Sequence, residues 1–187
     1  DTLRSRGLGD VYKRQREAIG GQISRANERW YSLAAIDYDT GYAVLNSFLL
    51  EMGLSVRPWL RTHGRLNLYT SPYIGTTNAL IGQNYATLEQ LSAFYTEEQL
   101  RTIARNRTTD VRHAQLGVSI DLSSRWKLDA YSDITDIEET IASVEVAAES
   151  SATQIATHVD LRGGSILKHA DSLQVGYGLF SDFRADT

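Results

Sequence analysis

Side chains that could support catalysis are few and scattered in this sequence. The histidines are His63, His113, His158 and His169, and none forms the i, i+4 pair of a His-Glu-x-x-His zinc motif. The sequence has no Gly-x-Ser-x-Gly elbow and no phosphate-binding glycine loop. His158 and Asp160, on one face of a predicted strand, are the nearest hint of a hydrolase assembled from several strands. The alternative is that both are solvated polar residues, and we predict a non-enzymatic protein with no catalytic residues, cofactor or metal.

A basic strip is the strongest candidate for a functional site. Arg61, His63 and Arg65 occupy alternate positions, and Arg57 precedes them. If these side chains line a channel, they would raise the local concentration of anions and steer acidic solutes. Carboxylates on other strands could instead neutralise the strip, and the candidates are Glu51, Asp121, Asp129 and Asp160.

The element that would position this strip is a long strand from about residue 42 to Arg57. Its clearest part places Phe48, Leu50, Met52, Leu54 and Val56 at every second position, between mostly polar or small residues. A period of two is typical of a strand with one apolar and one polar face. The run matches the roughly 9–11 residues that a tilted strand needs to cross a bilayer.

The same alternation recurs along the chain and predicts about eight strands. The other expected strands cover residues 18–25, 30–38, 60–68, 115–122, 126–134, 154–162 and 173–179. Between the strands expected at 60–68 and 115–122 the period changes. Thr87 with Gln90, and Thr96 with Gln99, fit the capping-box pattern, so we expect a helical insertion over residues 87–105. It could fill a lumen, cover the mouth or form an external loop.

Composition limits the classes of function. The formal net charge is −4, which argues against a general nucleic-acid binder, and no apolar run is long enough for a transmembrane helix. The absence of cysteine excludes disulfides and thiolate chemistry. Residues 136–150 predict an exposed acidic loop, and its glutamates lack the spacing of a Ca²⁺ loop.

The lengths of the connections favour an outer-membrane β-barrel. Short turns are expected near residues 27–29, 58–60, 123–125 and 164–171, with long connections at 71–110 and 135–151. Only the connection at 39–41 departs from this rule. Trp30, Trp59 and Trp126 all fall beside short turns, as an aromatic girdle at one membrane interface requires. The alternative is a soluble or surface-attached β-sandwich that binds a partner, with its apolar faces packed together.

The first fifteen residues call for a separate interpretation. The stretch from Leu3 to Gln15 resembles translated adapter sequence of the kind found at the edges of reading frames assembled from environmental DNA. That resemblance implies that residues 1–15 are not native and that 16–187 form a partial barrel domain of a longer protein. A natural basic tail is the alternative.

A family resemblance follows from the insertion and its flanking strands. The stretches Thr77-Asn-Ala-Leu-Ile-Gly-Gln83, Leu88-Glu-Gln-Leu91, Thr96-Glu-Glu-Gln-Leu-Arg101 and Arg105-Asn-Arg-Thr108 carry it. Over residues 16–187 the chain resembles the C-terminal β-barrel of bacterial outer-membrane proteins that have tetratricopeptide repeats upstream. The resemblance implies a bacterial outer-membrane location, contact with outer-membrane lipid, and transport or export, with a polysaccharide or an anionic solute as substrate. The chain itself contains no repeat helices, and no functional residue is carried over.

Overall fold

The fold is built almost entirely from β-strands. The computed structural model describes residues 17–141, 148, 150–164 and 171–184. The expectations for residues 1–15, for His169 and for Glu145 and Glu149 of the acidic loop lie outside this range. The strands are β1 (Ala18–Ala26), β2 (Trp30–Asp39), β3 (Val44–Arg57), β4 (Leu60–Ser71), β5 (Thr109–Asp121), β6 (Trp126–Ile137), β7 (Ala152–Gly164) and β8 (Ser172–Arg184).

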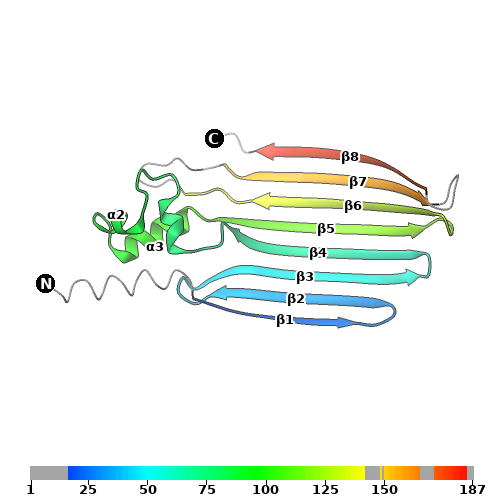
Figure 1. Ribbon diagram of the computed structural model, residues 1–187, viewed down its shortest axis with the longest axis horizontal. Coiled ribbons are helices and arrows are strands. Elements are labelled where there is room, and N and C mark those ends of the chain that lie inside the picture. The colour runs from blue at the N-terminus through cyan, green and yellow to red at the C-terminus, as the bar shows by residue number, and fades with distance from the viewer. Residues whose placement is uncertain (1–16, 142–147, 149, 165–170, 185–187) are drawn as a thin grey trace.

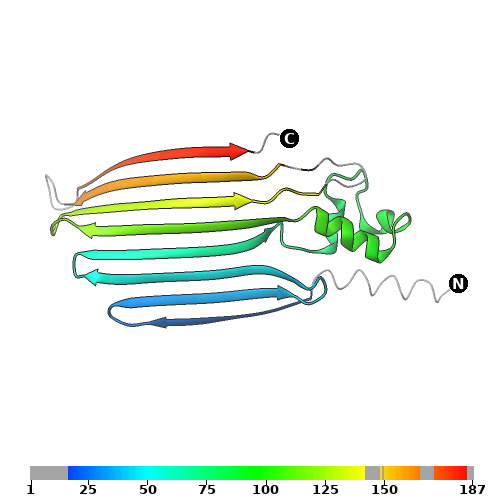
Figure 2. The same cartoon turned by 180° about the vertical axis from the view of Figure 1, so that it is seen from behind.

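The strands form one antiparallel sheet in chain order, which confirms the predicted all-β meander (Figure 1). Strand β1 and strand β8 lie on opposite margins of the sheet, and no described pairing joins them. The sheet is therefore open and does not close as a barrel. Figure 2 shows the opposite face, and in neither view does a helix cross the sheet.

The register divides the side chains into two faces. Residues paired across antiparallel strands point to the same side of a sheet, so one face can be followed through the pairs. One such row consists of Ile23, Ala34, Leu50, Leu66, Ala114, Ile134 and Ile155, and we call its side the apolar face. A neighbouring row contains Glu51, Arg65, Gln115 and Asp133, and we call its side the polar face.

The two ends of the sheet differ. The turns after β1, β3 and β5 are short and share one end, which we call the short-turn end. The opposite end holds the turn at residues 40–43 and the long connection between β4 and β5. That connection contains the 3₁₀ helix η1 (Thr76–Leu80) and the helices α2 (Leu88–Ser92) and α3 (Glu97–Asn106), which lie beyond the ends of the strands (Figure 1).

Local capping explains where the two α-helices begin. The Thr87 side chain accepts a hydrogen bond from the backbone N–H of Gln90. Thr96 and Gln99 form a complete capping box, since each side chain accepts from the other residue's backbone N–H. Both devices satisfy N–H groups that have no partner within a helix, so the predicted helical insertion is confirmed in place and type.

The helices form a small core of their own at this end. Ala79, Leu88, Leu91, Leu100, Ile103 and Ala104 are buried together. Tyr42, in the turn after β2, packs against this core, and its hydroxyl donates to Thr76 Oγ1 at 3.1 Å. The Arg101 guanidinium lies over the Tyr42 ring and donates to the carbonyl of Gly41 at 3.4 Å. These contacts join the insertion to the neighbouring turn.

Candidate functional site: the polar face of the sheet

Three of the four residues of the predicted basic strip lie on the polar face, and the fourth does not follow their alternation. Arg61, His63 and Arg65 follow each other along β4 on the polar face. A register shift after Ser55 pairs Arg57 with Leu60, so Arg57 is out of step with the other three. The strip on the polar face therefore consists of two arginines with a histidine between them.

Carboxylates on neighbouring strands stand beside these arginines. Arg61 Nη2 donates to both carboxylate oxygens of Asp121 on β5, at 2.7 and 3.0 Å. Arg65 stands opposite Glu51 on β3 in the register, and Glu51 accepts a hydrogen bond from the Tyr31 hydroxyl at 3.2 Å. The polar face thus places opposite charges side by side along its wall.

A second group of charges lies on β5, β6 and β7 near the short-turn end. Asp129 accepts a short hydrogen bond from the Ser119 hydroxyl and forms an ion pair with Lys127 at 3.0 Å. Arg162 Nη1 lies 3.9 Å from the other oxygen of Asp129. Asp160 stands opposite Asp129 and accepts from Gln174 at 3.2 Å. The arrangement is a network of compensating charges.

Rings lie close to glycines along one row of the polar face. A Cβ built on Gly53 would stand 2.1 Å from the Tyr31 ring, and one on Gly117 would stand 2.2 Å from the His63 ring. The His158 ring lies near Gly178 in the same way, since a Cβ built on Gly178 would stand 3.0 Å from His158 Nδ1. Each ring leans over the strand that follows its own. The rings therefore line the wall of this face instead of standing away from it.

Among the described residues, His158 and Asp160 do not form the hydrogen-bonded pair that a hydrolase would use. Its ring stacks on Tyr131, with ring centroids 4.9 Å apart and an angle of 19° between the planes. Asp160 is hydrogen-bonded to Gln174, as described above. A different histidine and carboxylate meet elsewhere on this face, where His113 Nε2 lies 3.1 Å from Asp133 and Gln115 donates to the same carboxylate oxygen at 2.8 Å. In the described ranges, no group of three or more His, Asp or Glu side chains is placed to hold a metal ion.

The three tryptophans lie at the short-turn end of the sheet, and their role as an aromatic girdle remains a prediction. Trp30 and Trp126 are the first residues of β2 and β6, and Trp59 lies in the turn between β3 and β4. The Trp126 ring lies over Gly163 of β7, and Arg25 lies over the Trp30 ring at 5.6 Å. Trp59 is half exposed.

Large apolar side chains on the apolar face are more exposed than two carboxylates on the polar face. On the apolar face Leu116 is 73% exposed and Met52 is 54% exposed. On the polar face the side chains of Asp129 and Asp133 are only 15% and 18% exposed. Neighbouring side chains thus cover the carboxylates of Asp129 and Asp133, while Leu116 and Met52 have little cover among the described residues.

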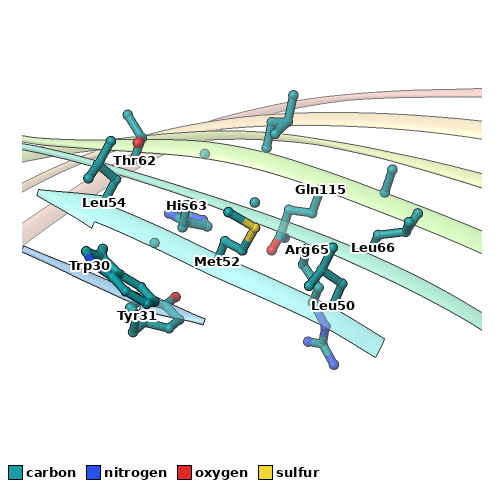
Figure 3. Close-up of a pocket in the computed structure, with 15 residues that line it drawn as sticks. Trp30, Tyr31, Leu50, Met52, Leu54, Thr62, His63, Arg65, Leu66 and Gln115 are labelled. Carbon is teal, nitrogen blue, oxygen red and sulfur yellow. The ribbon is translucent and has the colours of Figure 1, made fainter. Parts of the chain in front are cut away.

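A hollow on the apolar face shows the same lack of cover. It has a volume of about 870 Å³, and its lining includes Gly64, which stands between Met52 and Leu116 in the register. Figure 3 shows Leu50, Leu54 and Leu66 around it. A soluble sandwich would seat a second sheet on such a surface.

Sequence reasoning missed the pairs of a ring with a glycine, because they depend on register. The alternation placed Gly53, Gly117 and Gly178 on polar faces, but only pairing across strands shows which ring covers which glycine. A signal was present in the positions of Tyr31 and His63, which lie at similar distances from the short turns.

Comparisons with protein-family models, curated proteins and solved structures found no match to this chain. No helix in the described part of the chain is long and apolar enough to cross a membrane.

Proposed function

We propose that this chain forms part of the wall of a bacterial outer-membrane β-barrel with a non-enzymatic transport or export role. In this proposal the apolar face contacts lipid, and the polar face lines a water-filled lumen. The observation that carries it is the difference in exposure between the two faces. Exposed apolar patches of this extent are rare on soluble monomers, whereas a lipid-facing wall requires one.

The dimensions of the apolar face support a membrane location. On β3 the outward positions run from Phe48 to Val56. At about 3.3 Å per residue and a tilt of about 40°, they span roughly 20 Å of membrane, near the apolar band of about 25 Å in such barrels. Arg112 and Asp136 occupy the next apolar-face positions on β5 and β6, and they form an ion pair at 3.8 Å. This charged pair would mark the interface opposite the tryptophan girdle.

The polar face suits the passage of polar solutes. Its charges are of both signs, and the Tyr31 and His63 rings lie close to the wall, so a lumen bordered by this face would stay hydrated. Arg61 and Arg65 supply the positive part of the field. An acidic solute or an acidic polysaccharide is the substrate class that these arginines would favour.

Vesicle flux tests this proposal. The chain is folded into phosphatidylcholine vesicles, and the efflux of a small anionic dye is compared with that of a neutral dye of equal size. We expect efflux of both dyes, faster for the anion. The double substitution of Arg61 and Arg65 by Gln should remove the preference for the anion. Arg105→Gln, on the exposed side of α3, is the matched control and should leave it unchanged. Inserted protein that passes neither dye would contradict the transport role.

A further inference from the structure

Two arginines stand on the apolar face near the short-turn end. Arg25 belongs to the odd-numbered residues of β1 that lie on this face, and its guanidinium lies over the Trp30 ring at 5.6 Å. The register shift near the end of β3 pairs Arg57 with Leu60, an apolar-face position of β4. A bulge re-aims the side chains beside it, and this one moves Arg57 from the polar series to the apolar face.

No carboxylate neutralises these two guanidinium groups in the described part of the chain. Arg25 and Arg57 are exposed, and neither takes part in an ion pair with a described residue. Glu28, in the turn after β1, is not paired with either of them. At the opposite end of the same face Arg112 forms an ion pair with Asp136. The short-turn end of the apolar face therefore carries positive charge that is open to an external anion.

The hollow of the apolar face begins beside these arginines. Trp30, the first residue of β2, is part of its lining, and Leu50 and Leu66 line it further along the strands (Figure 3). Four residues separate Leu54 from Leu50 on β3, so the hollow extends roughly 13 Å at about 3.3 Å per residue. Its volume of about 870 Å³ lies in the usual range of ligand sites, roughly 300–1,000 Å³.

The position of the charges relative to the hollow indicates its occupant. Arg25 on β1 and Arg57 at the end of β3 stand on either side of the strand that begins with Trp30. An apolar hollow suits a hydrocarbon chain, and guanidinium groups bind phosphate oxygens through charge-assisted hydrogen bonds. A tryptophan between them suits the level of lipid headgroups, where its ring is half buried. A free anion would have no use for the hollow, and a neutral lipid would leave both arginines without a partner.

We propose that the apolar face binds an anionic phospholipid, with one acyl chain in the hollow and the headgroup phosphate beside Arg25 and Arg57. This inference rests on the proposed membrane location. It adds a preferred lipid at one place on a wall that other lipids cover without selection.

Quenching of Trp30 by brominated lipid tests this site. Trp59→Phe and Trp126→Phe leave Trp30 as the single tryptophan, at the edge of the hollow. This chain is folded into phosphatidylcholine vesicles that contain an equal mole fraction of either phosphatidylglycerol or phosphatidylcholine with the same brominated acyl chains. We expect the brominated phosphatidylglycerol to quench more strongly, with a binding preference of at least about fivefold, the effect of one arginine beside an anionic lipid surface.

Three variants of this chain separate the charges from the hollow. Arg25→Gln with Arg57→Gln should lower the preference at least about fivefold. The matched control, Arg61→Gln with Arg65→Gln, removes the same charge from the polar face and should leave the preference unchanged. Gly64→Leu fills the hollow while both arginines stay, and it should also lower the preference. Each value is normalised to emission in vesicles without bromine.

The other outcomes overturn the inference. Equal quenching by the two brominated lipids in an inserted chain would mean that no anionic lipid is selected, and the membrane proposal would stand. A preference that survives the loss of Arg25 and Arg57, or that falls equally in the polar-face control, would mean general attraction by net charge. A preference unchanged by Gly64→Leu would mean that the acyl chain lies elsewhere. A chain that does not insert, with no blue shift of tryptophan emission and no protection from protease, would overturn the membrane proposal as well.

Discussion

Glycines on the polar face leave space that the rings of residues on neighbouring strands occupy. Gly53 leaves room for the Tyr31 ring, whose hydroxyl then reaches Glu51. A side chain at this position would push the ring away from the wall and break that hydrogen bond. These small residues therefore shape the surface of the polar face and are not merely flexible points of the strand.

Replacing Gly53 by Ala should destabilise the folded sheet by about 1–2 kcal/mol, because the new Cβ overlaps the Tyr31 ring. Gly164→Ala is the control, since a Cβ there meets nothing within 4 Å, and its effect should stay within about 0.5 kcal/mol. Urea unfolding from vesicles measures both. In a Tyr31→Ala background the cost of Gly53→Ala should vanish; an unchanged cost would contradict the role of the ring.

Adjacent residues on β5 give opposite predictions for the same substitution. Leu116→Arg should cost about 2–4 kcal/mol in a bilayer, as charges on a lipid-facing wall do near the midplane. Gln115→Arg, beside Asp133 on the polar face, should cost less than about 1 kcal/mol. Urea titration in vesicles measures both, and equal costs at the two positions would show that the faces are not distinguished by lipid.

Individual contacts were the least predictable part of the site. Alternation alone placed Arg61, His63 and Arg65 on one face. It could not show that Arg61 pairs with Asp121, because that contact depends on the register of strands 60 residues apart in sequence. Nor could it show that the turn at Pro58 shifts Arg57 to a position opposite Leu60.

At the scale of elements, the half-buried phenol of Tyr42 joins the helical insertion to the turn after β2. Burial is the largest influence on Tyr42 and raises its pKa, and the nearby carboxylates of Asp39 and Glu97 act in the same direction. The hydrogen bond to Thr76 and the charge of Arg101 oppose this increase. The neutral phenol is therefore favoured in the folded insertion.

The insertion should loosen in alkaline solution as a result. Because the folded pKa is raised, the stabilisation is fully present below the ordinary phenol value of 10.0 and is lost as the pH rises through the folded pKa. The rate of proteolysis within residues 76–106 should rise above pH 10. Tyr42→Phe lacks the Thr76 hydrogen bond, so it should be cleaved faster at pH 7, by an amount equivalent to about 0.5–1.5 kcal/mol, with a weaker increase above pH 10. An increase as steep as that of the unaltered chain would contradict the role of Tyr42.

The elements themselves were largely predictable. The alternation from Phe48 to Arg57 and the two threonine caps identified β3, α2 and α3 because each signal is local. The 3₁₀ helix η1 was not predicted, since Thr76–Leu80 has no side-chain cap and its helical turn depends on the packing of Ala79 into the core. Strand β5 begins at Thr109, earlier than its clean alternation, because its first residues pair with the end of β4.

At the scale of the whole molecule, the sheet has one apolar face, and its margins β1 and β8 have no pairing partner among the described residues. The predicted meander is confirmed, and the account of the molecule as a membrane-spanning wall remains our proposal. What pairs with β1 and β8 could not be predicted. Pairing at the margins of a sheet depends on contacts between distant parts of the sequence and not on the pattern within each strand.

A spin-label scan along β5 tests the central claim most directly. Single cysteines are introduced from Ala114 to Asp121, leaving out Gly117, and labelled after folding into vesicles. If the apolar face contacts lipid, labels at Ala114, Leu116, Val118 and Ile120 will be accessible to oxygen dissolved in lipid. Labels at Gln115, Ser119 and Asp121 should be accessible to a water-soluble nickel complex. Equal access of the nickel complex to both sets, or no access of oxygen to the first set, would contradict a lipid-facing wall.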